Sequence, residues 1–259
     1  MKYLVFRMYG PMASWGEIAV GESRHSAGYP GKSAITGLLG AALGIGRSDD
    51  TEQHALANGY ALAVKMSVSG ALLTDYHTTQ VPDSTGKFRY RTRRDELVTG
   101  KDRLGTILSS REYFTDSVAI VAVRAVDQAA WSLEQLQKAL LKPKFHLYLG
   151  RKACPLAAPL QPQIVDAEGF LAAFDDYVAK PLLQSRQEWV NDNRYLKPDA
   201  TCHYYWQGDV ADFADQETVP QQAVHKLVRH DQPLSRQRWQ FQPRTENLWL
   251  QSPPTGGDK

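Results

Sequence analysis

The sequence predicts an α+β fold built on the ferredoxin-like βαββαβ order, which also underlies RNA-recognition domains. The first observation is that strand and helix patterns follow this order over the first 150 residues. The second is a stretch of about 38 residues, 74–111, which interrupts the order and has little core-forming pattern. Such a segment in a compact domain is typically a functional insertion or a disordered loop. The third is that the chain becomes less regular after residue 162, which predicts an irregular C-terminal extension.

The first half of the predicted core begins with a strand over residues 2–9, which are rich in Tyr, Leu, Val and Phe and precede Gly10-Pro11. Residues 32–45 follow with apolar side chains at helical spacing. Three glycines in this helix recur at intervals of three and four and therefore share a face. Because glycine disfavours a helix, this face indicates close packing against a sheet or a partner backbone. Residues 60–73 predict the second strand.

The second half of the core begins after the insertion. Residues 114–126 predict a strand that is apolar on both faces, which indicates a central, buried position. Residues 127–141 predict the second helix, in which Ser132 and Gln135 resemble a capping box. Residues 144–149 then complete the βαββαβ order as its fourth strand.

Shorter patterns follow residue 162. In chain order they predict an amphipathic helix, an aromatic strand, an acidic loop and two final strands, over residues 166–178, 202–206, 209–222, 225–228 and 237–241. The sequence contains no internal repeat and no convincing linker, so we expect one unit. Residues 253–259 are expected to be a disordered tail.

Composition restricts the class of protein. With 259 residues, 42% of them hydrophobic and 22% charged, the chain is an ordinary globular protein with enough apolar residues for a core. Its two cysteines, Cys154 and Cys202, cannot build a disulfide framework or a cysteine-based zinc site. The N-terminal apolar run is too short for a signal peptide, and no stretch approaches the roughly 18 apolar residues of a membrane span. We therefore expect a reducing cytoplasm and no membrane partner.

Charge is distributed unevenly although the formal net charge is only +2. Residues 87–111 carry eight Lys or Arg and three acids, whereas residues 161–220 carry four Lys or Arg and eleven acids. Residues 226–244 carry five Lys or Arg and one acid. This asymmetry predicts a polyanion on one side of the molecule and a different neighbour on the other, with chance clustering as the alternative.

The most basic stretch, 87–94, alternates basic and aromatic residues. In a strand, successive side chains point to opposite faces, so one face would carry Lys87, Arg89, Arg91 and Arg93, and the other Phe88 and Tyr90, followed by Arg94. Guanidinium groups in a row suit phosphates, and nearby rings suit unstacked bases. The alternative is a solvated strand whose charges protect an edge from aggregation.

A second basic-aromatic cluster spans residues 141–155. Its predicted strand ends at Gly150 and is followed by Arg151 and Lys152 on a loop, and a glycine there allows a backbone to approach a phosphate closely. The generic sequence motif of RNA-recognition domains is absent, so simple base stacking across the sheet is not supported.

Two features near the N-terminus have alternative interpretations. Gly31-Lys32-Ser33 at a helix start suggests a P-loop, but the glycine required five residues before Gly31 is Ser26, and Pro30 removes a backbone N–H. Nucleotide hydrolysis is therefore disfavoured, although Lys32 and Ser33 could still hold one RNA phosphate. Trp15, in the loop after the first strand, either stacks on a base or fills the edge of the core.

The seven histidines have no zinc-ligand spacing, so we expect no metal and no cofactor. A metal-independent ribonuclease would need a general base and a general acid near a 2′-hydroxyl, together with a cation for the developing charge. His77 and His146 are the candidates for this alternative. Their more common role would be as ordinary binding or core histidines.

Several blocks in a fixed order carry a family resemblance. They are Gly10-Pro11-Met12 with Trp15-Gly16, Pro30 with Lys32-Ser33 leading into the 37–45 glycine helix, Asp75-Tyr76-His77-Thr78, Arg111-Glu112-Tyr113, and Leu141-Lys142-Pro143 through Tyr148-Leu149-Gly150-Arg151-Lys152 to Cys154-Pro155-Leu156. Together they resemble the CasD-type subunit family of type I-E Cascade, a CRISPR RNA-guided surveillance complex. The resemblance covers about residues 1–160 and thins afterwards to Arg229-x-Asp231-x-Pro233 and the Trp-containing C-terminus.

The resemblance implies a ferredoxin-like RNA-binding palm over residues 1–160 and a protruding β-hairpin thumb at about 75–113. The remaining residues, 161–259, would be a C-terminal extension packed on the same unit. It also implies a non-catalytic subunit that caps the 5′ handle of the crRNA. Its expected partners are the Cascade backbone subunit, the large PAM-reading subunit and, through the complex, target DNA in a prokaryotic cytoplasm. A related branch in type I-C cleaves repeat RNA, which remains the enzymatic alternative.

We expect two groups of site residues from this resemblance. The handle contacts are Arg111, Tyr148, Arg151, Lys152, Lys144, Arg24, Lys32, Ser33, His77 and Trp15. The thumb contacts with RNA or a neighbouring subunit are Lys87, Arg89, Tyr90, Arg91, Arg93 and Arg94.

Overall fold

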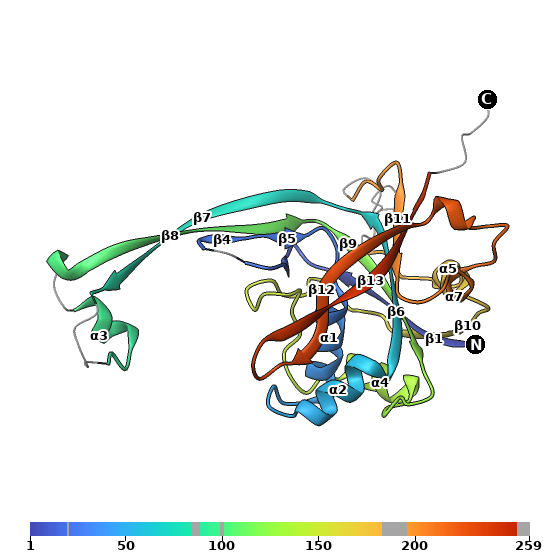
Figure 1. The fold of residues 1–259 in the computed structure, drawn as a ribbon, viewed down its shortest axis with the longest axis horizontal. Helices are drawn as coiled ribbons and strands as arrows, with labels where there is room; N and C mark the ends of the chain where they lie inside the picture. The colour runs from blue at the N-terminus through green and yellow to red at the C-terminus, as the bar shows by residue number, and fades with distance from the viewer. Residues whose placement is uncertain (20, 84–88, 99–100, 183–195, 253–259) are drawn as a thin grey trace.

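A seven-stranded antiparallel sheet crosses the body of the molecule (Figure 1). The computed structural model describes residues 1–19, 21–83, 89–98, 101–182 and 196–252. The strand order is β10 (Gln163–Asp166), β1 (Lys2–Tyr9), β9 (Val118–Ala125), β6 (Tyr60–Val68), β11 (Cys202–Trp206), β13 (Gln240–Gln251) and β12 (His225–Ser235). The protein therefore has a mixed α+β fold dominated by antiparallel strands.

Two connections in this sheet skip a strand. β1 and β6 lie on either side of β9 and are joined through α1 (Lys32–Leu43) and α2 (Asp50–Asn58). β9 and β10 lie on either side of β1 and are joined through α4 (Leu133–Leu141). The predicted capping box of this last helix is confirmed, since Ser132 and Gln135 bond reciprocally.

The prediction of a fourth strand over residues 144–149 is wrong. The strand that pairs with β1 there is β10, and residues 144–149 form a loop whose only ladder contact among the described residues is an isolated bridge from Tyr148 to Pro155. The physical reason is the end of α1. Its carbonyl oxygens at Ala41 and Ala42 accept hydrogen bonds from the backbone of Phe145 and Lys144, so those N–H groups are not available to a sheet.

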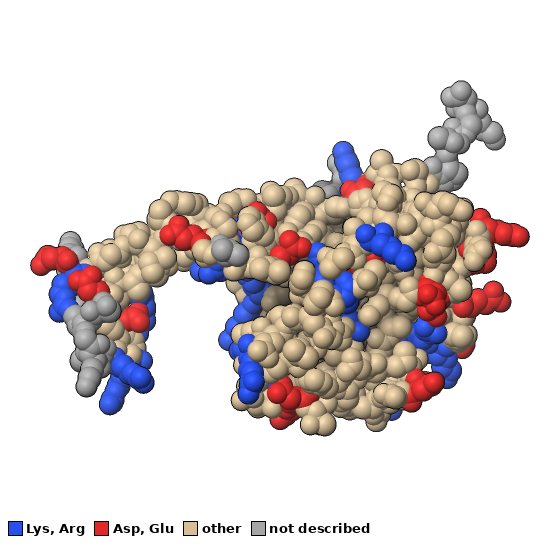
Figure 2. All heavy atoms as spheres, viewed as in Figure 1, with Lys and Arg blue, Asp and Glu red and all other residues tan. Residues whose placement is uncertain are grey.

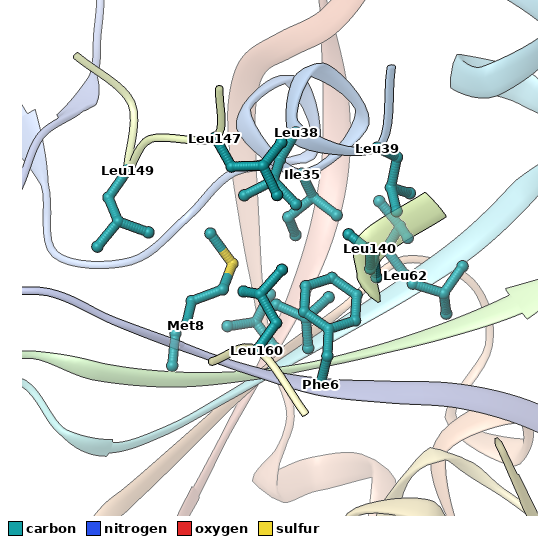
Figure 3. Packing of buried hydrophobic residues seen from close by; sticks show 14 of the residues in the cluster. Phe6, Met8, Ile35, Leu38, Leu39, Leu62, Leu140, Leu147, Leu149 and Leu160 are labelled. Carbon is teal, nitrogen blue, oxygen red and sulfur yellow. The ribbon is translucent and has the colours of Figure 1, made fainter. Parts of the chain in front are cut away.

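The core lies on both faces of the sheet. On β1, Leu4, Phe6 and Met8 belong to one buried cluster, whereas Tyr3 and Val5 belong to the other. This alternation is the two-residue period of a strand that is covered on both sides. Figure 3 shows the first cluster, where Phe6 and Met8 lie under leucines of α1, α4 and the following loops.

The second cluster is built mostly by the C-terminal part of the chain. Its helices are α5 (Phe170–Asp175) and α7 (Val210–Phe213), and Trp206 stacks on Phe213 with ring centroids 4.2 Å apart. A 3-10 turn spans Gln221–Ala223 before β12 begins. Because β10, β11, β12 and β13 supply four strands of the main sheet, the prediction of an irregular extension is wrong for this region. Residues 253–259 lie outside the described residues.

The insertion between β6 and β9 is a long hairpin that projects from the body (Figure 1). β7 (Ala71–Pro82) pairs with β8 (Leu104–Thr115) along its whole length, and α3 (Arg93–Leu97) and a 3-10 turn (Lys101–Arg103) lie near its far end. We call residues 71–115 the thumb hairpin. The extended conformation expected for 87–94 is wrong at its end, because Thr92 caps α3 and Arg93 begins it. Lys87 and Phe88 lie outside the described residues.

Short strands join the hairpin to the body. They are β2 (Met12–Ala13), β3 (Trp15–Gly16), β4 (Ser23–Arg24) and β5 (Ser26–Ala27), of which β2 and β4 pair with β8. None of the described helices is long and apolar enough to cross a membrane.

Candidate nucleic-acid interface

The loop over residues 142–152 is held by the end of α1 and by Ser14. Lys144 N donates to Ala42 O at 3.0 Å, and Ser14 N donates to Leu149 O at 3.1 Å. Gly150 has φ 83°, and a Cβ there would lie 1.8 Å from the carbonyl oxygen of Ser14. Only glycine fits this left-handed and crowded position, so the loop is held against the start of the chain. We call residues 142–152 the basic loop.

Three arginines from separate segments meet beside the basic loop. Arg24 on β4 is in parallel register with Arg111 on β8. Arg151 donates from Nη2 to the carbonyl oxygen of Arg24 at 3.1 Å, and its guanidinium lies 4.8 Å from the ring centroid of Tyr113. The Nη1 of Arg151 is buried without a hydrogen-bond partner among the described residues. Arg24 is exposed, whereas Arg111 and Arg151 are half-buried. The exposed part of this arginine cluster, Arg24, Arg111 and Arg151, presents positive charge that suits a phosphate.

The carboxylate of Glu112 lies next to the arginine cluster, and that of Asp75 is in register with Arg111 on the neighbouring strand. Glu112 accepts hydrogen bonds from His25 Nδ1 at 2.9 Å and from the backbone nitrogen of Ser26 at 3.0 Å. The pKa of Glu112 is held below its ordinary value, mainly by the hydrogen bond from His25. The hydrogen bond from Ser26 and the charge of Arg151 lower it further. The carboxylate is thus engaged in ordering the β4–β5 segment.

The thumb hairpin presents further basic residues toward an open hollow. Figure 2 shows this hollow between the far end of the hairpin and the body, with Lys and Arg side chains on both of its sides. Arg89, Arg91 and Arg94 are exposed. Arg93 has a structural role, because it pairs with Glu96 at 2.6 Å and donates to the carbonyl oxygen of Gln80. Tyr90 is half-buried.

The remaining expected contacts lie on the basic loop and on the thumb hairpin. Lys144, Tyr148 and Lys152 lie exposed on the basic loop, with Tyr148 40% exposed. His77 is paired in register with Ser109 midway along the thumb hairpin and lies 3.8 Å from a carboxylate oxygen of Asp75. Arg111 faces the same Asp75 across the two strands.

Two expected contacts are corrected by the structure. Trp15 is 3% exposed and belongs to the core, so it fills the core edge and does not stack on a base. Lys32 is 6% exposed, and its Nζ donates to Gln207 Oε1 at 3.0 Å. The pKa of Lys32 is lowered to about 8, mainly by burial and also by the charge of Arg244. Ser33, by contrast, is only half-buried.

The P-loop alternative is also contradicted. The N-terminus of α1, where a P-loop would hold a phosphate, is occupied by the carboxylate of Asp231, which accepts from Lys32 N at 2.6 Å. A Cβ at Gly31 would lie 2.2 Å from the same carboxylate. The glycine at this position therefore makes room for a side chain of the protein itself.

Sequence reasoning missed a second group of residues on the other side of the basic loop. Arg47, Arg236 and Trp239 gather there, and the Arg47 guanidinium lies 4.1 Å from the centroid of the Trp239 ring. The Arg-Gln-Arg-Trp sequence at 236–239 is a basic-aromatic pattern that could have indicated it. Within the described residues no group of three or more His, Cys, Asp or Glu could hold a metal ion.

Comparison with known proteins supports the sequence resemblance. The family described as "CRISPR-associated protein (Cas_Cas5)" matches residues 3–246. The "CRISPR system Cascade subunit CasD" of Escherichia coli (strain K12) is 36% identical over 168 residues, which cover 61% of this chain and 69% of that protein.

Solved structures show the same fold. One chain, described as "CRISPR RNA-guided surveillance complex", superposes with a TM-score of 0.62 at 23% identity and covers 96% of this chain and 89% of its own. A second, described as "Crystal structure of Cas protein", gives a TM-score of 0.54 at 22% identity over 97% of this chain and 93% of its own.

Proposed function

Because the chain belongs to the Cas5 family of CRISPR-associated proteins, we propose that it is an RNA-binding subunit of a type I-E Cascade. In this role it holds the 5′ handle of the crRNA and connects the RNA to neighbouring subunits during antiviral defence. The related CasD subunit from Escherichia coli supports the assignment by its name and its identity over 168 residues.

The observation that carries this proposal is the arginine cluster. Arg24, Arg111 and Arg151 come from three segments and are brought together by parallel register and by one hydrogen bond. A guanidinium over an aromatic ring, as in Arg151 over Tyr113, is a common element of single-stranded RNA sites. Tyr148 and Lys152 on the basic loop extend the same surface.

The proposed palm is a ferredoxin-like unit. The order β10-β1-β9-β6, with its two helical connections that each skip a strand, supports this interpretation. The thumb hairpin then leaves the unit between its second and third strands, as an arm with exposed arginines at its far end. We propose that this arm contacts RNA or the adjacent backbone subunit.

The remaining partners follow from membership of such a complex. We propose that the body contacts the large PAM-reading subunit and meets target DNA only through the assembly, in the cytoplasm of a prokaryote. The acidic surface expected from residues 161–220 is a candidate for contact with a basic neighbour.

We propose a structural role without catalysis. For the endoribonuclease alternative, His77 on β7 and His146 on the basic loop would supply acid and base. Incubation of the purified chain with CRISPR repeat RNA in EDTA distinguishes the two roles. Cleavage that is lost in His77→Ala or His146→Ala would establish the enzyme and contradict the structural role.

The binding proposal is tested by replacing Arg111 and Arg151 with Ala. Affinity for crRNA should fall, and the slope of log affinity against log salt should flatten by about 0.7 for each lost phosphate contact. Lys138→Ala/Lys197→Ala removes the same charge from two other exposed positions and serves as the control. Equal affinity and equal slope in the two double variants, with circular dichroism confirming their fold, would contradict the site.

A further inference from the structure

A cavity of about 310 Å³ lies between α1, the basic loop and the turn that joins β12 to β13. We propose that it holds one unstacked RNA nucleotide, with the base against aromatic side chains and the phosphate against two arginines. This inference rests on the proposed function, because it extends the RNA path beyond the arginine cluster. We call this cavity the Trp239 cavity.

Three partly exposed aromatic side chains line the Trp239 cavity. Phe145, Tyr148 and Trp239 line it and are 51%, 40% and 58% exposed. These rings come from two segments about ninety residues apart, so their meeting depends on the fold and not on local sequence. Flat rings beside a cavity suit a nucleobase. Every kind of base can stack on them, so such a site does not depend on the RNA sequence.

The cavity also carries positive charge without a carboxylate to balance it. Arg47 and Arg236 form no ion pair with any carboxylate within the ranges described above. Arg47 donates from Nε to the carbonyl oxygen of Arg236 at 2.9 Å, which directs it over Trp239. Two such guanidinium groups favour an anionic occupant over an apolar peptide.

Arg236 is held in place by α1. It donates from Nη2 to the carbonyl oxygen of Ser33 and, at 3.0 Å, to Thr36 Oγ1, whereas its buried Nε has no partner among the described residues. A Cβ at Gly37 would come within 3.4 Å of both terminal nitrogens of this guanidinium. Gly37 on α1 therefore lies against this guanidinium, at a distance that an alanine methyl group would also accept.

The conformation of Trp239 supports a binding role. Its φ is 51°, in the left-handed region that glycine adopts with less strain. A large aromatic side chain in such a turn, more than half exposed, is a feature that concentrates at ligand sites.

The cavity is continuous with the arginine cluster through the basic loop. Tyr148 and Gly150 line the cavity, and the next residue, Arg151, bonds to Arg24 and covers Tyr113. A strand of RNA that crosses the loop would thus meet both sites in succession.

The test uses the full chain and a 12-nucleotide oligouridine that contains one 4-thiouridine. Trp239→Ala and Arg47→Gln should each weaken binding by about tenfold, as measured by fluorescence anisotropy. Trp239→Phe keeps a ring and should recover most of the loss. Arg238→Gln, on the same turn but outside the cavity lining, should bind within about twofold of the unaltered chain.

Photo-crosslinking locates the base. Crosslinks to peptides that contain residues 145–148 or 236–241 are expected, and they should be lost in Trp239→Ala. Unchanged affinity of Trp239→Ala and Arg47→Gln, while Arg111→Ala/Arg151→Ala is weakened, would overturn the cavity and leave the proposed function intact. If Trp239→Ala, Arg47→Gln and Arg111→Ala/Arg151→Ala all bind RNA with unchanged affinity, the proposed function itself is contradicted.

Discussion

Asp231 Oδ2 lies 2.6 Å from the backbone nitrogen of Lys32, 199 positions earlier in the chain. Asp231 thereby supplies the N-terminal cap that α1 lacks locally, since its own N-cap residue is Gly31. The same carboxylate accepts from Arg244 at 2.6 and 3.1 Å, and Arg244 also pairs with Glu246. The C-terminal hairpin and the first helix are therefore joined by a buried network.

We predict that Asp231→Asn is strongly destabilising. Breaking a buried charge pair leaves Arg244 incompletely compensated, which costs about 3 kcal/mol of unfolding free energy. This change in unfolding free energy is measured by urea unfolding, with circular dichroism as the signal. Asp127→Asn, at an exposed position, should change the unfolding free energy by less than about 0.5 kcal/mol. Equal midpoints for the two variants would show that the network contributes little.

Lys32 gives a prediction for pH dependence. Its pKa of about 8 in the folded protein is below the ordinary value of 10.5, so the unfolded chain binds more protons between these values. Stability contributed by this group therefore rises with pH in that window. From pH 7.5 to 9.5 the unfolding free energy of the unaltered chain should gain roughly 2 kcal/mol relative to Lys32→Met.

The pH range is chosen to exclude tyrosines. The pKa of Tyr29 is raised in the folded protein, mainly by burial. Its hydroxyl therefore ionises more readily in the unfolded chain, which reduces stability near and above pH 10. Lys152→Met, at an exposed position, should follow the unaltered chain across the whole range. Parallel curves for Lys32→Met and the unaltered chain would contradict the assigned pKa.

Local patterns predicted the elements whose side chains obey one clear period. β1 and α1 are examples, because their apolar residues follow the two-residue and helical spacings. The capping box before α4 was also predictable, since it needs only two residues three positions apart. By contrast, α2 has few apolar residues and β10 has four residues in all, so neither has a strong period.

The candidate site was predictable only in part, because its geometry depends on contacts distant in the chain. Arg151 and Arg111 were selected through a family resemblance, which the family match and the CasD relative confirm at the level of the family. That Lys32 is buried could not be predicted, because its partners Gln207 and Asp231 lie in the C-terminal part. Trp239 was missed because its cavity forms only when the β12–β13 turn packs on α1.

Gly150 is predicted to control the position of the basic loop. Gly150→Ala would place a methyl group 1.8 Å from Ser14 O at a φ of 83°, so the loop must move. We expect the unfolding free energy to fall by at least about 1 kcal/mol. RNA binding should also weaken, because Arg151 and Tyr148 are displaced with the loop. Gly16→Ala is the control, because a Cβ there meets no atom within 4 Å. RNA affinity that is equal in the two variants would show that the loop position is not important for binding.

The thumb arginines are predicted to divide into two roles. Arg93 bridges Glu96 and the backbone of β7, so Arg93→Gln should loosen α3. Amide hydrogen exchange over residues 93–97 should then become several-fold faster, because local opening costs less free energy. Arg89→Gln/Arg91→Gln/Arg94→Gln alters only exposed side chains and should leave these exchange rates unchanged.

The second role is binding. The triple variant should retain less crRNA or less backbone subunit when the complex is purified, whereas the unaltered chain retains both. If the triple variant assembles normally, the exposed arginines do not contact either partner. If Arg93→Gln exchanges at the rate of the unaltered chain, its ion pair does not hold α3, and the capping box of Thr92 and Asp95 alone is sufficient.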